Sequence, residues 1–159
     1  MTALGTGTIT QVALIVRDVE AVKATWAKLL GVPVPPTVDA GDYAVTGTVL
    51  RGQPAPDACC RMAFFDVAPG VQLEIIEPNG VASAWQDFLD EHGEGVHHLA
   101  FGVTDTDARL EALAAEFGWP LIQRGKYGDA SGQYAYVDAH ADLKVDLELL
   151  ESFPEGDRD

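Results

Sequence analysis

Residues 97–105, HHLAFGVTD, repeat the pattern of residues 10–18, TQVALIVRD, and this match decides the fold. The residue numbers of the two copies differ by 87 throughout. Thirteen residues beyond the aspartate that closes each copy, Asp18 or Asp105, a Gly-x-Pro triplet begins. A match of this length within one chain indicates two related structural units.

A second match closes each unit. Residues 71–77, VQLEIIE, resemble residues 145–151, VDLELLE, and here the numbers differ by 74. The difference of 13 between the two offsets predicts an insertion in the first unit, most simply within the stretch rich in Pro and Gly at 34–57. The sequence therefore predicts two modules, at residues 1–80 and 81–159, that together form one domain.

Hydrophobic periodicity and punctuation predict the same elements in both modules. Alternation at 9–16 and at 96–103 is typical of half-buried strands. Asp18 and Asp105 are predicted to cap helices that end at the glycine of each triplet. The predicted apolar stripes of the two helices are Val19, Val22, Trp26, Leu29 and Leu30, and Leu110, Leu113 and Phe117. Further strands are predicted at 44–50, 61–66, 71–77, 121–125, 133–138 and 144–150, and a short linking helix at 82–91.

Composition limits the classes of partner and compartment. A formal net charge of -15 repels phosphate backbones and anionic lipid headgroups, so neither nucleic acid nor a membrane surface is an expected partner. No apolar run approaches the ~20 residues that span a bilayer, and the first residues show no signal peptide, so we expect a cytoplasmic protein. The adjacent Cys59 and Cys60 cannot form an ordinary structural disulfide, which fits a reducing compartment.

The tandem β-α-β-β-β pattern resembles the vicinal oxygen chelate superfamily, which includes glyoxalase I, methylmalonyl-CoA epimerase and bleomycin resistance proteins. The segments that carry the resemblance are ITQVALIVRDVEAVKATWAKLLGVP, FLDEHGEGVHHLAF and the terminal VDLELLE. The resemblance implies an α+β fold whose two modules curve into one cup-shaped mixed sheet. It also implies a divalent metal held by one residue from each of four strands.

Strand alternation selects the residues that face the cup. On the second module's first strand, His98 shares a face with the small Ala100, while the bulky Leu99 and Phe101 are expected to pack on the helix. The repeat makes Gln11 the equivalent of His98. On the closing strands Glu74 and Glu148 occupy equivalent positions.

An imidazole, two carboxylates and an amide oxygen suit a divalent ion such as Zn, Ni, Co, Mn or Mg. We predict that Gln11, Glu74, His98 and Glu148 are its ligands. By resemblance, glyoxalase I-like proteins use His or Gln at the first position, Glu at the second, His at the third and Glu at the fourth. The epimerases usually have His first. No other cofactor is expected.

The resemblance implies a metal-dependent isomerase, epimerase or lyase that removes a proton next to a carbonyl and forms a metal-stabilised enolate. Glu148 is the expected principal base, and Glu74 the opposite acid or base. The partner is a small-molecule substrate. A CoA thioester is disfavoured by charge, because basic residues that could meet its phosphates are few: Arg17, Arg51, Arg61, Arg124 and Lys126. Tyr127, Tyr134 and Tyr136 could contact a ligand, and the chain is expected to form a homodimer.

Three alternatives stay open. A non-catalytic small-molecule or antibiotic-binding protein would use the cup without metal chemistry. An iron-dependent dioxygenase would need two histidines and one carboxylate, and Gln11 leaves one histidine missing. A metal-free lyase or cyclase would recruit local acids.

Five residues near the predicted ligands have other expected roles. Glu77 and Glu151, on the opposite strand face, are expected to be solvated. His97 is expected to bond a backbone group, or to exchange roles with His98 if the register shifts by one residue. His92 and His140 are expected on the surface.

Overall fold

Ten strands and five helices make up residues 2–156, the part of the chain that the computed structural model describes. The strands are β1 (Ile9–Ile15), β2 (Val38–Asp39), β3 (Val49–Leu50), β4 (Gln53–Pro54), β5 (Cys60–Ala68), β6 (Val71–Pro78), β7 (Gly95–Gly102), β8 (Leu121–Lys126), β9 (Gly132–Val137) and β10 (Asp146–Ser152). The helices are α1 (Val19–Leu30), α2 (Tyr43–Thr46), α3 (Ala84–His92), α4 (Thr106–Phe117) and α5 (His140–Leu143).

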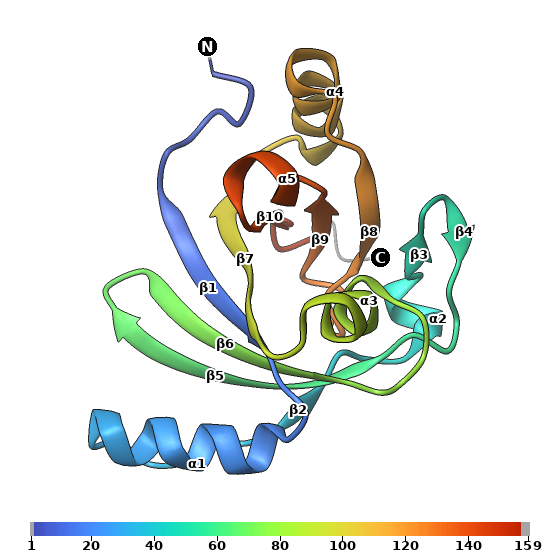
Figure 1. The fold of residues 1–159 in the computed structure, drawn as a ribbon. Coiled ribbons are helices and arrows are strands. Elements are labelled where there is room, and N and C mark those ends of the chain that lie inside the picture. The colour runs from blue at the N-terminus through green and yellow to red at the C-terminus, as the bar shows by residue number, and fades with distance from the viewer. Residues whose placement is uncertain (1, 157–159) are drawn as a thin grey trace.

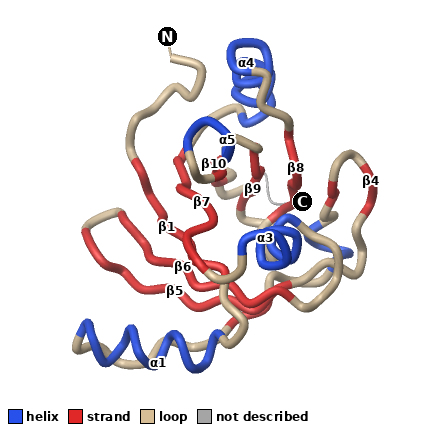
Figure 2. The backbone as a smooth tube through the Cα atoms, viewed as in Figure 1, coloured by secondary structure: helices blue, strands red, loops and turns tan. Residues whose placement is uncertain are grey.

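All ten strands belong to one mixed sheet, in the order β2-β5-β6-β1-β7-β10-β9-β8-β3-β4. The sheet is strongly curled, and α1 and α4 lie on its outside at opposite ends (Figures 1 and 2). The predicted α+β fold with a curved mixed sheet is confirmed.

The register of the central strands relates the two repeats by an approximate twofold axis. In the antiparallel β1–β7 pair, Gln11 lies opposite Ala100 and Ala13 lies opposite His98. The two parallel pairs, β1–β6 and β7–β10, lie symmetrically on either side of the β1–β7 pair. In them Glu74 lies beside Ala13 and Glu148 beside Ala100. The equivalence of Gln11 with His98, and of Glu74 with Glu148, is therefore built into the hydrogen-bonded sheet.

The strand predicted at 44–50 is wrong for residues 44–48 and correct only for 49–50, which form β3. Residues 43–46 form the short helix α2, capped by the Asp42 side chain, which accepts a hydrogen bond from the Ala44 N–H. The chain then forms β3, which pairs with β8 at the far edge of the sheet. The predicted insertion at 34–57 thus reaches across the cup, and the division into modules 1–80 and 81–159 stays a proposal.

The two long helices cover outer faces of the sheet, and their ends are as predicted. Asp18 accepts a hydrogen bond from the Ala21 N–H and Asp105 one from the Ala108 N–H, and both helices end at a glycine in the left-handed conformation. The predicted apolar stripes are only partly correct. Leu29 is 73% exposed and Phe117 47%, because the helices contact the sheet over their first turns and middle more than at their C-terminal ends.

Three clusters make up the hydrophobic core. One lies between α1 and the outer face of β5 and β6, and another lies between α4 and the outer face of β9 and β10. The third lies inside the curl, where Trp85 and Phe88 of α3 pack with Tyr134 and Tyr136. The inner face of the cup is therefore lined by aromatic rings next to the polar residues of β1, β6, β7 and β10.

Glu77 and Glu151 are not simply solvated, which corrects the prediction for both. Each lies near the C-terminal end of its strand and accepts a backbone N–H at the start of a long helix. Glu77 accepts from the Val19 N–H at 2.8 Å. Glu151 accepts from the N–H groups of Asp105 and Thr106 at 2.8 and 3.1 Å. Both carboxylates satisfy helix donors that have no partner within the helix.

We expect Glu151→Gln to lower the free energy of unfolding by about 1–2 kcal/mol at pH 7, because the charge on this capping group is lost. Although burial opposes ionisation of this carboxyl, hydrogen bonds from Thr106, Gln133 and the α4 backbone lower its pKa from 4.5 to about 2. The stabilisation is therefore complete above pH 4.5 and is lost as the pH falls from 4.5 towards 2. Urea unfolding at pH 7 and pH 3 measures it, with the exposed Glu116→Gln as control. If Glu151→Gln lowered the free energy of unfolding equally at pH 7 and pH 3, the stabilisation would not come from the charge of Glu151.

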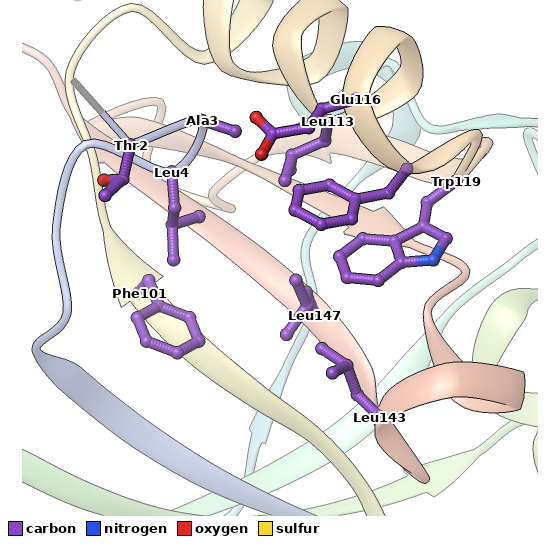
Figure 3. Close-up of a pocket in the computed structure, with 10 residues that line it drawn as sticks. Thr2, Ala3, Leu4, Phe101, Leu113, Glu116, Trp119, Leu143 and Leu147 are labelled. Carbon is purple, nitrogen blue, oxygen red and sulfur yellow. The ribbon is translucent and has the colours of Figure 1, made fainter.

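A surface pocket of about 680 Å³ lies between the N-terminal residues, α4 and β10. Figure 3 shows Leu4, Phe101, Leu113, Trp119 and Leu147 pointing into it. Its walls are mostly apolar, and Thr2 and Glu116 are its polar lining residues, so it lacks the cluster of converging polar groups of a reaction site.

Among residues 2–156, no helix is both long and apolar enough to span a bilayer.

Candidate metal centre

The structure brings the four predicted ligands together inside the cup of a single chain. His98 Nε2 lies 2.9 Å from Glu148 Oε2 and 3.3 Å from Glu74 Oε2. The side-chain amide of Gln11 lies 3.0 Å from Oε2 of both glutamates. Four polar atoms from β1, β6, β7 and β10 therefore surround one point.

The four side chains are almost fully buried, with exposed fractions of 6% for Gln11, 5% for Glu74, 0% for His98 and 4% for Glu148. They meet because alanines lie next to them on the central strands. Glu74 pairs with Ala13 and Glu148 with Ala100, so the neighbour of each glutamate on the central strands has a small side chain. A buried cluster of two carboxylates is stable only with a positive charge beside it.

The pKa values of His98 and Glu74 show how the protein offsets the negative charge of the two buried carboxylates. Burial opposes protonation of His98, but the two carboxylates outweigh it and raise its pKa to about 10. Burial also raises the pKa of Glu74, although His98 partly offsets the effect. In the metal-free protein the His98 imidazolium is thus the cation of the cluster at neutral pH.

The donor set fits a divalent ion. Although His98 Nε2 lies close to both carboxylates, it is buried and makes no well-aligned hydrogen bond with any described residue. The Gln11 amide can donate to both glutamates with its nitrogen inward, or present its oxygen to a cation at the same place. Three buried residues, Glu74, His98 and Glu148, offer ligand atoms within 4.8 Å of one another. One nitrogen and three oxygens form a set that Zn, Ni, Co, Mn and Mg accept.

A bulge places His97 beside the centre, which alternation did not predict. Between Ala13 and Leu14 the β1–β7 register shifts, because β7 uses two residues where β1 uses one. The extra residue is His97, and both histidines are fully buried. Nδ1 of His97 lies 2.9 Å from Nδ1 of His98, so the prediction that His97 bonds a backbone group is wrong.

The iron dioxygenase alternative is disfavoured by this geometry. It requires a second imidazole nitrogen beside the carboxylates. His97 faces His98 Nδ1 with one nitrogen and Asp146 with the other, at 3.6 Å, so it contributes none. His92 and His140 stack on each other at 4.5 Å beside a cavity of about 270 Å³ that Asp146 also lines.

Tyr136, which the sequence predicts as a possible ligand contact, lies beside the centre, together with Trp85 and Gln123 of the same interior, which the sequence did not mark as functional. The Tyr136 ring lies 4.9 Å from His98, and its hydroxyl accepts a hydrogen bond from Trp85 Nε1. Gln123 accepts from the Ala84 N–H and so holds the start of α3. Burial, followed by the charge of Glu148, raises the pKa of Tyr136, which keeps this phenol neutral. Alternation in β9 is consistent with the inward position of Tyr136, but no local signal identifies Gln123.

Cys60 lies in the same interior cluster but is unsuited to nucleophilic chemistry. It is 1% exposed, and burial, followed by the charge of Glu74, raises the pKa of its thiol well above the usual value. A nucleophilic cysteine needs the opposite shift. The chemistry of the centre therefore depends on carboxylates and a cation.

Four of the five basic residues that could meet phosphates are already paired. Arg51, Arg61 and Arg124 each lie 2.8 Å from a carboxylate, and Arg17 lies 3.9 Å from Glu94. Each nearby carboxylate lowers the local positive charge that its arginine offers to a phosphate of CoA, although pairs as exposed as these are weak.

Comparison with known proteins agrees with this geometry. A family model described as the glyoxalase/bleomycin resistance protein/dioxygenase superfamily matches residues 10–137. The uncharacterized protein YqjC of Bacillus subtilis is 32% identical over 98 residues, which are 62% of this chain and 68% of YqjC. An ethylmalonyl-CoA/methylmalonyl-CoA epimerase of Cereibacter sphaeroides is 28% identical over 108 residues, 67% of this chain and 69% of the epimerase.

The fold is shared with a solved enzyme structure. Methylmalonyl-CoA epimerase from Mycobacterium tuberculosis superposes with a TM-score of 0.66 at 24% identity, covering 98% of this chain and 93% of the epimerase. At that level of identity the likeness concerns the fold alone.

Proposed function

The chain belongs to the glyoxalase/bleomycin resistance protein/dioxygenase superfamily, and from that premise we propose that it is a metal-dependent isomerase, epimerase or lyase. It would act by removing a proton from the carbon next to a substrate carbonyl. The observation that carries the proposal is the convergence of Glu74, His98 and Glu148, with Gln11, on one buried point.

Gln11, Glu74, His98 and Glu148 would hold the ion. When bound, a divalent cation supplies Lewis-acid stabilisation of negative charge on substrate oxygens. The chain supplies the proton transfers. Glu74 and Glu148 approach from the two related strands β6 and β10, so a substrate between them would have a carboxyl group on either side.

We assign proton removal to Glu148 and proton return to Glu74. Burial raises the pKa of Glu74, which favours its protonated form and suits it to donate. Return to the opposite face of the same carbon would give an epimerase, and return to the neighbouring carbon an isomerase of the glyoxalase I type. Gln11 supports the second, because the resemblance places His rather than Gln at this position in most epimerases.

The charge of the protein favours a small substrate over a CoA thioester. The net charge is -15, and Arg17, Arg51, Arg61 and Arg124 already pair with carboxylates. The similar proteins of C. sphaeroides and M. tuberculosis are named as epimerases of acyl-CoA compounds, so the thioester is the alternative to be tested. We propose small 2-oxo acids or hemithioacetals as the substrate class.

The test is proton exchange in heavy water, followed by NMR. Protein purified without chelator is analysed for metal and then offered 2-oxo acids, hemithioacetals and acyl-CoA thioesters in turn. We expect bound divalent metal and exchange at the carbon beside the carbonyl, with a loss of at least about 100-fold after chelation and recovery on adding metal back. Bound metal without exchange of any substrate would contradict the proposal and favour a binding protein.

A homodimer also stays a prediction, to be tested by light scattering. The edge strands β2 and β4 are only two residues long each, so pairing through sheet edges has little backbone to use. The exposed Leu29, Leu30 and Val32 at the end of α1 give an apolar surface for a dimer instead.

A further inference from the structure

His97 and His98 contact each other through their Nδ1 atoms. Their Nδ1 atoms are 2.9 Å apart, so one must donate and the other accept. Both residues are fully buried, and the contact exists because the bulge in β7 interrupts the alternation that would separate neighbouring side chains. On the far side of His97, Nε2 lies 3.6 Å from Asp146 Oδ2, too far for a hydrogen bond, and it has no hydrogen-bond partner among the described residues.

A cation on Nε2 of His98 makes His98 the donor in this contact. A histidine that binds a cation through Nε2 is neutral and carries its proton on Nδ1. In His98 that Nδ1–H points at Nδ1 of His97, which must then accept. His97 therefore keeps its own proton on Nε2, the nitrogen that faces the Asp146 carboxylate.

Neighbouring rings hold the His97 ring in the position where its Nδ1 can accept the Nδ1–H of His98. Phe88 lies 4.9 Å from it and Tyr136 5.4 Å, measured between ring centroids, and none of the residue is exposed. Asp146 is anchored by the same sheet, because its backbone pairs with that of His98. The three side chains form a line from the centre of the cup to the cavity lined by Asp146 and His140.

We propose that His97 is a positioning residue, which accepts the Nδ1–H of His98 and so holds Nε2 of His98 towards Glu74 and Glu148, while the rings of Phe88 and Tyr136 hold His97 in turn. The inference rests on the proposed metal centre. Neither His97 nor Asp146 touches the metal or substrate in this arrangement. Metal-bound histidines depend on such a partner for ring orientation, and its loss typically costs 10–100-fold in metal affinity.

The first test compares Zn²⁺ affinities by competition with a chromophoric chelator. We expect His97→Phe, which keeps an aromatic ring but has no acceptor, to lose 10–100-fold in affinity. His97→Asn should stay within about fivefold of the wild type, because its amide oxygen can take the place of Nδ1. His92→Phe is the matched control, since His92 lies equally close to Phe88, at 4.9 Å, without contacting His98. Unchanged affinity in His97→Phe would overturn the proposal.

The second test is independent of Zn²⁺ binding and of variant folding. In the ¹⁵N NMR spectrum of wild-type protein, we expect His97 to carry its proton on Nε2 and none on Nδ1, both without metal and with Zn²⁺. A proton on Nδ1 of His97 would overturn the inference even if the protein binds metal. If the wild type binds no metal, the proposed function fails, while this spectrum still decides between the two tautomers.

Discussion

Glu148→Gln is expected to lower substrate proton exchange by about 10²- to 10⁴-fold, the range that loss of a positioned general base produces. The glutamine amide has nearly the size of the carboxyl group but cannot accept a proton at neutral pH. Packing against Tyr136, the cross-strand neighbour, is therefore expected to persist. Circular dichroism and the thermal midpoint check that the fold is retained, and NMR in heavy water measures the exchange.

Two controls separate loss of the base from other effects. Metal content is measured in parallel, and exchange is assayed at saturating metal, so that a weaker site is not mistaken for a missing base. Glu151→Gln alters another glutamate of β10, three residues further on and facing α4, and should reduce stability without reducing exchange. Full activity of Glu148→Gln would remove Glu148 from the mechanism.

Metal binding is expected to release about one proton per ion at pH 7, and the apparent affinity to rise about tenfold per pH unit. The reason is His98. The carboxylates of Glu148 and Glu74 overcome the effect of burial and raise its pKa to about 10, so its ring is protonated at neutral pH in the metal-free protein. An ion that binds Nε2 must displace that proton. The apparent affinity for the metal ion therefore falls as the pH falls below 10, because protons compete with the ion for Nε2 of His98.

Titration calorimetry in buffers of different ionisation enthalpy counts the released protons. The raised pKa of Glu74 adds to the release at lower pH, because a protonated carboxyl must also lose its proton to bind. His98→Asn, which carries no such proton, should abolish most of the release and lower the affinity. Binding to wild-type protein without proton release at pH 7 would show that the ion does not use His98.

Much of the fold was predictable for two reasons. The ends of the helices depend on residues close to them in the sequence, and the same pattern occurs in both copies of the repeat. Asp18 and Asp105 cap their helices through their own side chains, and a glycine ends each helix, so few other residues are needed. Strand alternation, carried over by the repeat, placed Gln11, Glu74, His98 and Glu148 on one face. The structure brings these four side chains within contact distance.

Other features depend on contacts between distant segments. The strand predicted at 44–50 is present only at 49–50, because Asp42 caps a helical turn at 43–46. The remaining strand, β3, pairs with β8, more than 70 residues away. Leu29 fitted an apolar stripe but is 73% exposed, so the burial of the stripe depends on where the helix meets the sheet. Glu77 and Glu151 appeared solvated because the helix ends they cap lie elsewhere in the sequence.

The sequence by itself determined the duplicated unit, its helix ends and the four polar residues on one strand face, because each follows from periodicity or from a residue's own side chain. Only the tertiary structure decided that β7 carries a bulge at His97. Alternation alone would turn His97 away from His98, but pairing with β1 leaves one residue of β7 without a partner and brings the two rings together. Such a register shift depends on two strands more than 80 residues apart, so no local pattern contains it.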